Sequence, residues 1–162
     1  MGHYGVTIEV TTEETMFRSH DQKIEQLAEI EPFHHLKETD LKKVAAAADT
    51  IKLPAGKALI TQGKTNNTAF VLIDGEAEVN RNGVVVARLG PGAVIGEMGL
   101  LTQTEGVASV TLCQDSELLV MDGQHFLGVL AAVPEFALEL LTQMAHRLRA
   151  MDTALADRIE QS

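Results

Sequence analysis

The segment from Gly96 to Thr111, with the sequence GEMGLLTQTEGVASVT, carries the clearest indication of a fold and of a binding site. Gly96 and Gly99 flank Glu97 and allow backbone angles closed to other residues, so that peptide N–H groups can approach a ligand closely. Apolar residues at 98, 100 and 101 would anchor the segment to a core, and β-branched residues from 107 onward indicate a strand. A helical turn between two strands, directing N–H groups at one point, suits an anion such as a phosphate.

This segment resembles the phosphate-binding cassette of cyclic-nucleotide-binding domains, the family of the catabolite activator protein and the kinase regulatory subunits. The family pattern is Gly-Glu-Leu/Met-Gly/Ala-Leu-Leu, a variable loop, then Arg-Ser/Thr-Ala-Ser-Val; residues 96–101 match its first half and residues 108–110 its end. In that family the glutamate, here Glu97, accepts the ribose 2′-hydroxyl, and the N–H groups of Ala108 and Ser109 would bind the phosphate. The resemblance implies a ligand site formed by Gly96, Glu97, Met98, Gly99, Leu100, Val107, Ala108 and Ser109.

The arginine that grips the cyclic phosphate in the family has no counterpart in this chain. Gly106 and Val107 occupy the two positions that could align with it. A charge-assisted hydrogen bond is worth roughly 1.5–3 kcal/mol, or about tenfold to a hundredfold in affinity, so we expect weak binding. Arg88 is the first candidate for a substitute charge, and Arg147 or Arg149 of the C-terminal region are others. Exposure to solvent is the simpler interpretation of each.

The composition favours a single acidic globular domain. The chain has 162 residues and a net charge of −10, from 13 Lys+Arg against 23 Asp+Glu, without a cluster of basic residues. Nucleic acids and anionic membranes would repel such a chain, so we expect neither as a partner. The single cysteine, Cys113, and the lack of a signal peptide or a long apolar run favour the cytoplasm.

Two short helices are expected before the sheet region. Residues 1–18 form a loose N-terminal arm in this interpretation, with a short edge strand suggested by the alternation across residues 6–10. The domain then occupies residues 19–162, with helices within 19–49. Ser19 and Gln22 have the spacing of a capping box at the first helix, and the second is expected to begin near Thr39 or Asp40.

Residues 50–121 change to a two-residue period with frequent turn signals, which predicts many short antiparallel strands. Asn82-Gly83 is the strongest hairpin signal among them. The expected strands are 50–53, 58–61, 69–74, 76–81, 84–89, 94–95, 107–112 and 116–121. The predicted fold is mainly β with flanking helices: an eight-stranded antiparallel jelly roll, or double-stranded β-helix, with short N-terminal helices and a long C-terminal helix.

Residues 122–161 are expected to form two helices. Asp122 would cap the first, and the second would begin at Pro134. The second helix carries an apolar seam with the a/d spacing of a coiled coil: Ala137, Leu141, Met144, Leu148, Met151 and Leu155. This seam and the pairing of this helix in the activator-type family members together predict a parallel homodimer. We expect no DNA-binding domain after it, because the chain stops at Ser162.

Catalytic chemistry finds little support in the sequence. None of the six histidines falls in a predicted strand, so the metal site of a jelly-roll enzyme is not expected. Such an enzyme remains a third hypothesis, which bound metal would support. Ser109 has no histidine base nearby in sequence, and Cys113 is read as a small strand residue rather than a redox sensor. We expect no enzyme activity and no cofactor.

The leading hypothesis is therefore a non-enzymatic sensor or regulatory module that binds a cyclic nucleotide. Cyclic AMP is the first candidate ligand and cyclic GMP the second. The alternative is a degenerate family member that binds no cyclic nucleotide and serves as a dimerisation or protein-interaction module.

Overall fold

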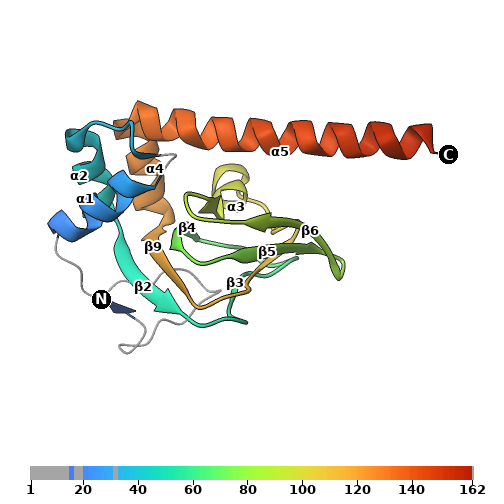
Figure 1. Ribbon diagram of the computed structural model, residues 1–162, viewed down its shortest axis with the longest axis horizontal. Coiled ribbons are helices and arrows are strands. Elements are labelled where there is room, and N and C mark those ends of the chain that lie inside the picture. Colours follow the sequence, from blue (N-terminus) through green and yellow to red (C-terminus); the bar gives the residue numbers. More distant parts are fainter. Residues whose placement is uncertain (1–14, 17–19, 31–32, 162) are drawn as a thin grey trace.

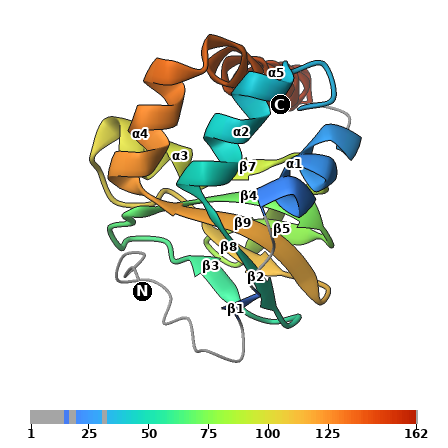
Figure 2. The same cartoon turned by 90° about the vertical axis from the view of Figure 1, so that its left-hand side faces the viewer.

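Two antiparallel sheets pack face to face, and helices cover the outer face of one of them (Figures 1 and 2). The computed structural model describes residues 15–16, 20–30 and 33–161. In chain order the elements are β1 (Thr15–Met16), α1 (His20–Glu29), α2 (Glu38–Ala47), β2 (Asp49–Leu53), β3 (Ala58–Ile60), β4 (Thr68–Asp74), β5 (Ala77–Arg81), β6 (Val84–Leu89), β7 (Val94–Ile95), α3 (Glu97–Thr102), β8 (Ser109–Leu112), β9 (Ser116–Asp122), α4 (Gly123–Ala132) and α5 (Pro134–Glu160).

The strand order confirms the predicted jelly roll. One sheet has the order β1-β2-β9-β4-β7 and the other β3-β8-β5-β6, with antiparallel pairing throughout. The eight strands β2 to β9 correspond to the eight expected strands, with ends that differ by at most two residues. At the predicted Asn82-Gly83 hairpin, φ is 53° and 83°, the two positive values that a type I′ turn requires.

The N-terminal arm is expected to be a loose segment, but two of its residues pair with the sheet. β1 pairs with β2, with Thr15 opposite Ile51 and Met16 opposite Thr50, so two residues of the arm extend the sheet. The edge strand suggested for residues 6–10 and the cap at Ser19 lie outside the described residues.

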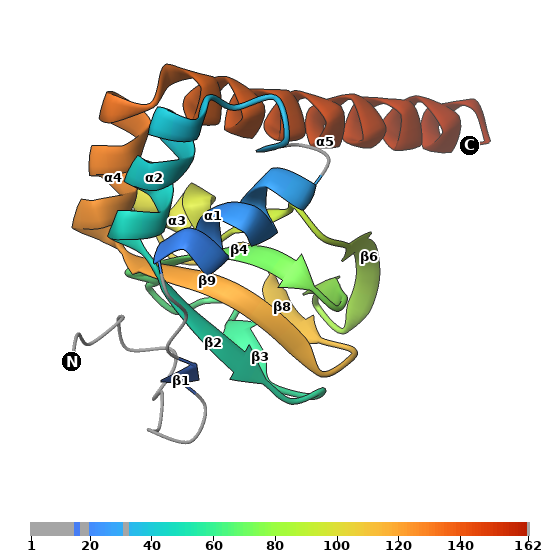
Figure 3. The ribbon, with the colours of Figure 1, turned by 60° about the vertical axis from the view of Figure 1, so that its left-hand side comes forward.

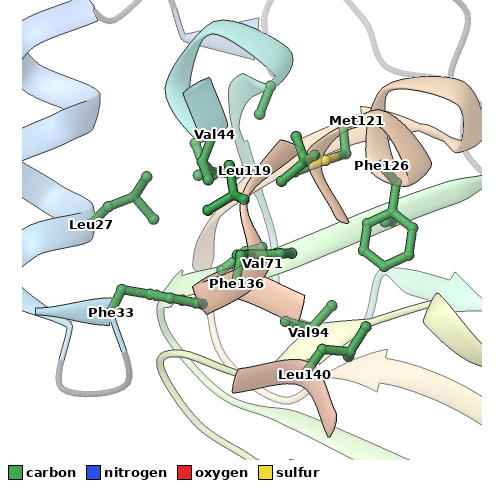
Figure 4. Close-up of a cluster of buried hydrophobic side chains, with 14 of the residues drawn as sticks. Leu27, Phe33, Val44, Val71, Val94, Leu119, Met121, Phe126, Phe136 and Leu140 are labelled. Carbon is green, nitrogen blue, oxygen red and sulfur yellow. The ribbon is translucent and has the colours of Figure 1, made fainter. Parts of the chain in front are cut away.

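The sheet beneath the helices is buried on both faces, because side chains alternate along β4 and β9. Ala69 and Val71 of β4 pack with the helices, whereas Phe70 and Leu72 point into the roll. Figure 4 shows the helix-facing cluster, in which Val71 and Leu119 of the sheet lie among Leu27, Val44 and Phe136. The near-continuous apolar sequence of β4 follows from this double burial.

Helix α5 lies across the roll and reaches beyond it (Figures 1 and 3). It follows α4 at a bend of 108°, and its 27 residues correspond to about 40 Å. Phe136 and Leu140 are buried, whereas residues 148–161 are all exposed. No single helix of the described residues is both long and apolar enough to span a bilayer, although the α4–α5 pair passes that test by length and composition alone. The distal half of α5 is thus a helix surface without a roll beneath it.

Candidate functional site

Gly96 fixes the geometry of the predicted cassette. It precedes α3 with a φ of 91°, and a Cβ at this position would collide with the carbonyl oxygen of Thr68. The side-chain amide of Asn66 stabilises this bend, because its Nδ2 donates to Thr68 O at 2.6 Å and to Gly96 O at 3.2 Å. Gly99 has no positive φ, and an added Cβ would meet only ordinary contacts there. The bend therefore depends on Gly96.

Glu97 is buried, with an exposed fraction of 1%. The Nη1 atom of Arg147 lies 2.8 Å from its Oε1, which makes a close ion pair between the cassette and α5. The guanidinium N–H does not point along this line, however, so Oε1 accepts no well-directed hydrogen bond. A buried carboxylate oxygen normally has such a donor, and this oxygen retains the capacity to accept a ligand hydroxyl.

Two successive turns of α5 hold the cassette and the strand before it. One turn before Arg147, the Gln143 side chain donates to Gly92 O at 2.7 Å and accepts from Val94 N at 3.1 Å. The interpretation of Arg147 as an arginine facing only solvent is therefore wrong. Residues 143 and 147 lie on one face of the helix, so the position of α5 sets the position of the guanidinium beside Glu97.

A pocket of about 100 Å³ opens beside Glu97. Its lining combines the cassette, the inner face of the roll and one residue of α5: Ile60, Asn66, Val79, Leu89, Val94, Ile95, Gly96, Glu97, Met98, Gly99, Gly106, Val107, Ala108, Val110 and Arg147. Ligand pockets commonly measure about 300–1,000 Å³, so a nucleotide would fit only after lining residues move. Met98 and Val107 are 46% and 50% exposed, which leaves them room to do so.

The structure brings together six of the eight predicted ligand-binding residues. Gly96, Glu97, Met98, Gly99, Val107 and Ala108 all line the pocket. Leu100 instead packs in the helix-facing core, and the hydroxyl of Ser109 accepts a hydrogen bond from Gln62 N at 2.9 Å. Neither Leu100 nor Ser109 contributes to the lining.

Arg88 does not reach this pocket. It pairs with Glu76 at 3.0 Å and Glu78 at 3.1 Å on the β5–β6 hairpin. The hydrogen bond to Glu76 and the charge of Glu78 raise the pKa of Arg88 above its ordinary value. Arg149 is exposed, and neither it nor Arg88 lines the pocket. Among the described lining residues, Arg147 is the one basic side chain, and Arg88 lies too far from the pocket to supply the substitute charge proposed for it.

Gly106, one of the two residues that could align with the missing arginine, forms backbone hydrogen bonds to a neighbouring loop. Gly106 N donates to Lys64 O at 3.0 Å, and Gly106 O accepts from Gly63 N at 2.8 Å. Arg147 pairs with the glutamate that would face the ribose, so it does not replace a cation at the phosphate position. Sequence reasoning missed Asn66 in this site and gave no role to the apolar residues of the roll that line it.

Among the residues that the structure describes, the other reactive groups form no second site. Burial and the nearby charge of Glu78 raise the pKa of the Cys113 thiol, so the reactive thiolate is disfavoured. Within the described ranges no group of three or more His, Cys, Asp or Glu residues has the arrangement of a metal site.

Replacing Arg147 by methionine tests the ion pair with Glu97. We expect a loss of about 1–3 kcal/mol in unfolding free energy, because Glu97 would keep its burial and lose its cation. The loss should be smaller than the 3–5 kcal/mol of a fully buried pair, since the Arg147 side chain is 37% exposed. Urea denaturation measures it, and Arg149→Met on the exposed face serves as the control. Equal stability of the two variants would show that the pair contributes nothing.

The comparison with protein families identifies the family of the domain. The sequence model described as "Cyclic nucleotide-binding domain" matches residues 50–132, about half of the chain, and includes the cassette. The cyclic AMP receptor protein of Thermus thermophilus is 32% identical over 107 residues, 63% of this chain and 50% of that protein. The regulatory subunit of the cAMP-dependent protein kinase of Schizosaccharomyces pombe is 30% identical over 133 residues, 82% of this chain and 31% of that protein. The chain thus spans half or less of the length of these relatives.

Solved structures agree in fold. The catabolite activator protein of Thermus thermophilus superposes with a TM-score of 0.67 and 29% identity, covering 77% of this chain and 61% of that one. The regulatory subunit of a cAMP-independent protein kinase A from Trypanosoma brucei has a TM-score of 0.68 at 20% identity, covering 78% and 46%, and shares the fold. The chain belongs to the cyclic nucleotide-binding domain family.

Proposed function

We propose that this chain is a non-enzymatic regulatory module that binds a cyclic nucleotide, with cyclic AMP as the first candidate. The observation that carries the proposal is Glu97, a buried carboxylate of the family cassette that lines the pocket and whose Oε1 accepts no directed hydrogen bond. A ribose 2′-hydroxyl would supply that donor. The relatives named above include a cyclic AMP receptor and a regulatory subunit of a cAMP-dependent kinase, which supports this ligand class.

Binding should be weak for a member of this family. A phosphate in the pocket would face Val107 and Ala108 and the backbone of this loop, without a guanidinium beside it. Peptide N–H groups can bind an anion, but they lack the full charge of an arginine. The apolar residues on the inner face of the roll would contact the rest of the nucleotide.

The ligand would act on α5 through Glu97. A hydroxyl that donates to Glu97 competes with Arg147 for the same carboxylate, and Arg147 is fixed to α5. Ligand binding would therefore change how strongly this turn of α5 is held against the cassette. Helix α5 exposes Leu141, Leu148, Met151 and Leu155 at coiled-coil spacing, and we assign this seam to a parallel dimer. Ligand binding at the pocket and dimerisation through α5 would then be thermodynamically linked.

Three observations favour the alternative, a family member that binds no cyclic nucleotide. The pocket is smaller than a nucleotide needs, and the loop carries no arginine. A protein of the same fold, from Trypanosoma brucei, is described as belonging to a cAMP-independent kinase, so the fold occurs without dependence on cyclic AMP. In that case the roll would serve as a scaffold that presents α5 for dimerisation.

Calorimetric titration with cyclic AMP and cyclic GMP decides between these two functions. The proposal predicts saturable heat at micromolar to millimolar ligand, with 5′-AMP, which lacks the cyclic phosphate, as the control. Heat of equal size from 5′-AMP would contradict specific recognition of the cyclic phosphate. A chain that gives no heat with millimolar cyclic nucleotide, while remaining folded by circular dichroism, belongs to the alternative.

A further inference from the structure

We infer that a second copy of this chain places its Asp152 against Arg147 and so completes the Glu97–Arg147 pair at the pocket. The inference rests on the dimer assigned to α5 in the proposed function. It adds a named contact across that dimer, contributed to the ligand site by the other subunit.

Helix α5 carries two contact faces that lie side by side. The face toward its own roll contains Phe136, Leu140, Gln143 and Arg147, which are buried or bonded to the roll. The exposed seam contains Leu141, Leu148, Met151 and Leu155, with Met144 partly buried at its start. At 3.6 residues per turn, the mean directions of the two faces differ by about 90°. Arg147 points within about 10° of the mean direction of the roll-facing residues and about 80° from that of the seam, so a helix packed on the seam would lie beside it.

The heptad positions bring Arg147 and Asp152 of different chains together. With Leu141, Leu148 and Leu155 at a and Met151 at d, Arg147 takes position g and Asp152 position e. In a parallel, in-register dimer, a g residue faces the e residue five positions further along the other helix. Within one helix, residues five apart point about 140° away from each other, so this contact forms only between chains.

This is the one charged g–e contact along the seam. The contact before it joins Leu140 to Ala145, and the contact after it joins Ala154 to Ile159. A single pair of opposite charges among apolar contacts specifies one register and one orientation. An antiparallel arrangement pairs g with g and e with e, so Arg147 would no longer face Asp152.

Arg147 can serve both carboxylates at once. Its Nη1 lies against Glu97, its side chain is 37% exposed, and a guanidinium carries five N–H donors in a rigid fork. Asp152 lies on the exposed part of α5, so it is accessible to a second chain. Asp152 of the second copy would contact the guanidinium from the side opposite to Glu97. Dimer formation would then influence how Arg147 pairs with Glu97 at the pocket.

A double-mutant cycle in sedimentation equilibrium, without nucleotide, tests the contact. Asp152→Asn should weaken the dimer about twofold to fivefold, and Asp152→Glu should restore it. Once Arg147 is methionine, Asp152→Asn should have no further effect. Asp157→Asn, an exposed carboxylate off the seam, is the charge-matched control. Additive effects at 147 and 152, an Asp152→Asn dimer as strong as the control, or a monomer throughout would each overturn the inference.

Disulfide trapping tests the orientation independently of Arg147. In a Cys113→Ser background, Met151→Cys at position d should yield an oxidised, covalent dimer, whereas Ala150→Cys on the outer face should not. Absence of the Met151→Cys dimer would contradict the parallel register. Because no ligand is present, a chain that binds no cyclic nucleotide can still pass both tests, and a chain that binds one can fail them.

Discussion

Replacement of Phe136 by alanine is expected to lower the free energy of unfolding by about 3–5 kcal/mol. Phe136 is 1% exposed and lies at the start of α5. Its ring stacks on Phe33, with centroids 5.7 Å apart, and meets Phe126 edge to face at 6.5 Å (Figure 4). Truncation would leave a cavity beside Phe33 and Phe126 of α4 and would remove both aromatic contacts.

Urea denaturation followed by circular dichroism measures this loss. Phe136→Leu, which keeps most of the apolar volume, should cost clearly less than the alanine variant. Arg149→Ala on the exposed side of the same helix should stay within about 0.5 kcal/mol of the natural chain. A loss below about 1 kcal/mol for Phe136→Ala would mean that α5 is not anchored by this cluster, and the position of Arg147 would lose its explanation.

Restoring an arginine to the cassette should increase the affinity for cyclic AMP about tenfold to a hundredfold. A charge-assisted hydrogen bond of roughly 1.5–3 kcal/mol to the cyclic phosphate corresponds to this range. Gly106→Arg follows the family pattern, and Val107→Arg occupies the neighbouring position, which is half exposed and lines the pocket. A Cβ on Gly106 would lie 3.3 Å from Thr61 O and 3.4 Å from Ile60 Cγ2, so the loop must shift by a few tenths of an ångström.

The increase in affinity is expected only for a ligand that carries the cyclic phosphate. Gly106→Met and Val107→Met provide side chains of similar reach without charge, and adenosine provides a ligand without phosphate. We expect at least one arginine variant to bind cyclic AMP more tightly, while adenosine binding and the methionine variants stay unchanged. If neither arginine variant gains affinity, the pocket does not place the phosphate beside this loop.

The sequence predicted the roll well because its signals are local. Short apolar segments bounded by turn signals marked β4 and β9, and Asn82-Gly83 marked a hairpin whose positive φ values the structure shows. The same reasoning assigned Leu100 less well, because this residue packs in the helix-facing core rather than at the pocket. Side chains alternate along an extended strand, so Ala108 and Val110 face the pocket while Ser109 points away from it toward Gln62.

The ion pair between Glu97 and Arg147 could not be predicted from local patterns. The two residues are far apart in sequence, and nothing about Arg147 as an isolated residue distinguishes it from Arg149. The helical period did contain a signal, because Arg147 continues the roll-facing series Phe136, Leu140 and Gln143, whereas Arg149 lies about 150° away from that face. Tertiary packing then decided which arginine meets the buried carboxylate.

The most direct test of Glu97 as the ligand's hydroxyl acceptor is a calorimetric comparison of cyclic AMP with 2′-deoxy cyclic AMP. A hydrogen bond to a charged, buried acceptor predicts that the natural chain binds cyclic AMP about tenfold to a hundredfold more tightly than the deoxy analogue. In a Glu97→Gln variant the difference should shrink. Equal affinities of the natural chain for the two nucleotides, or no binding of either at millimolar concentration, would contradict this account.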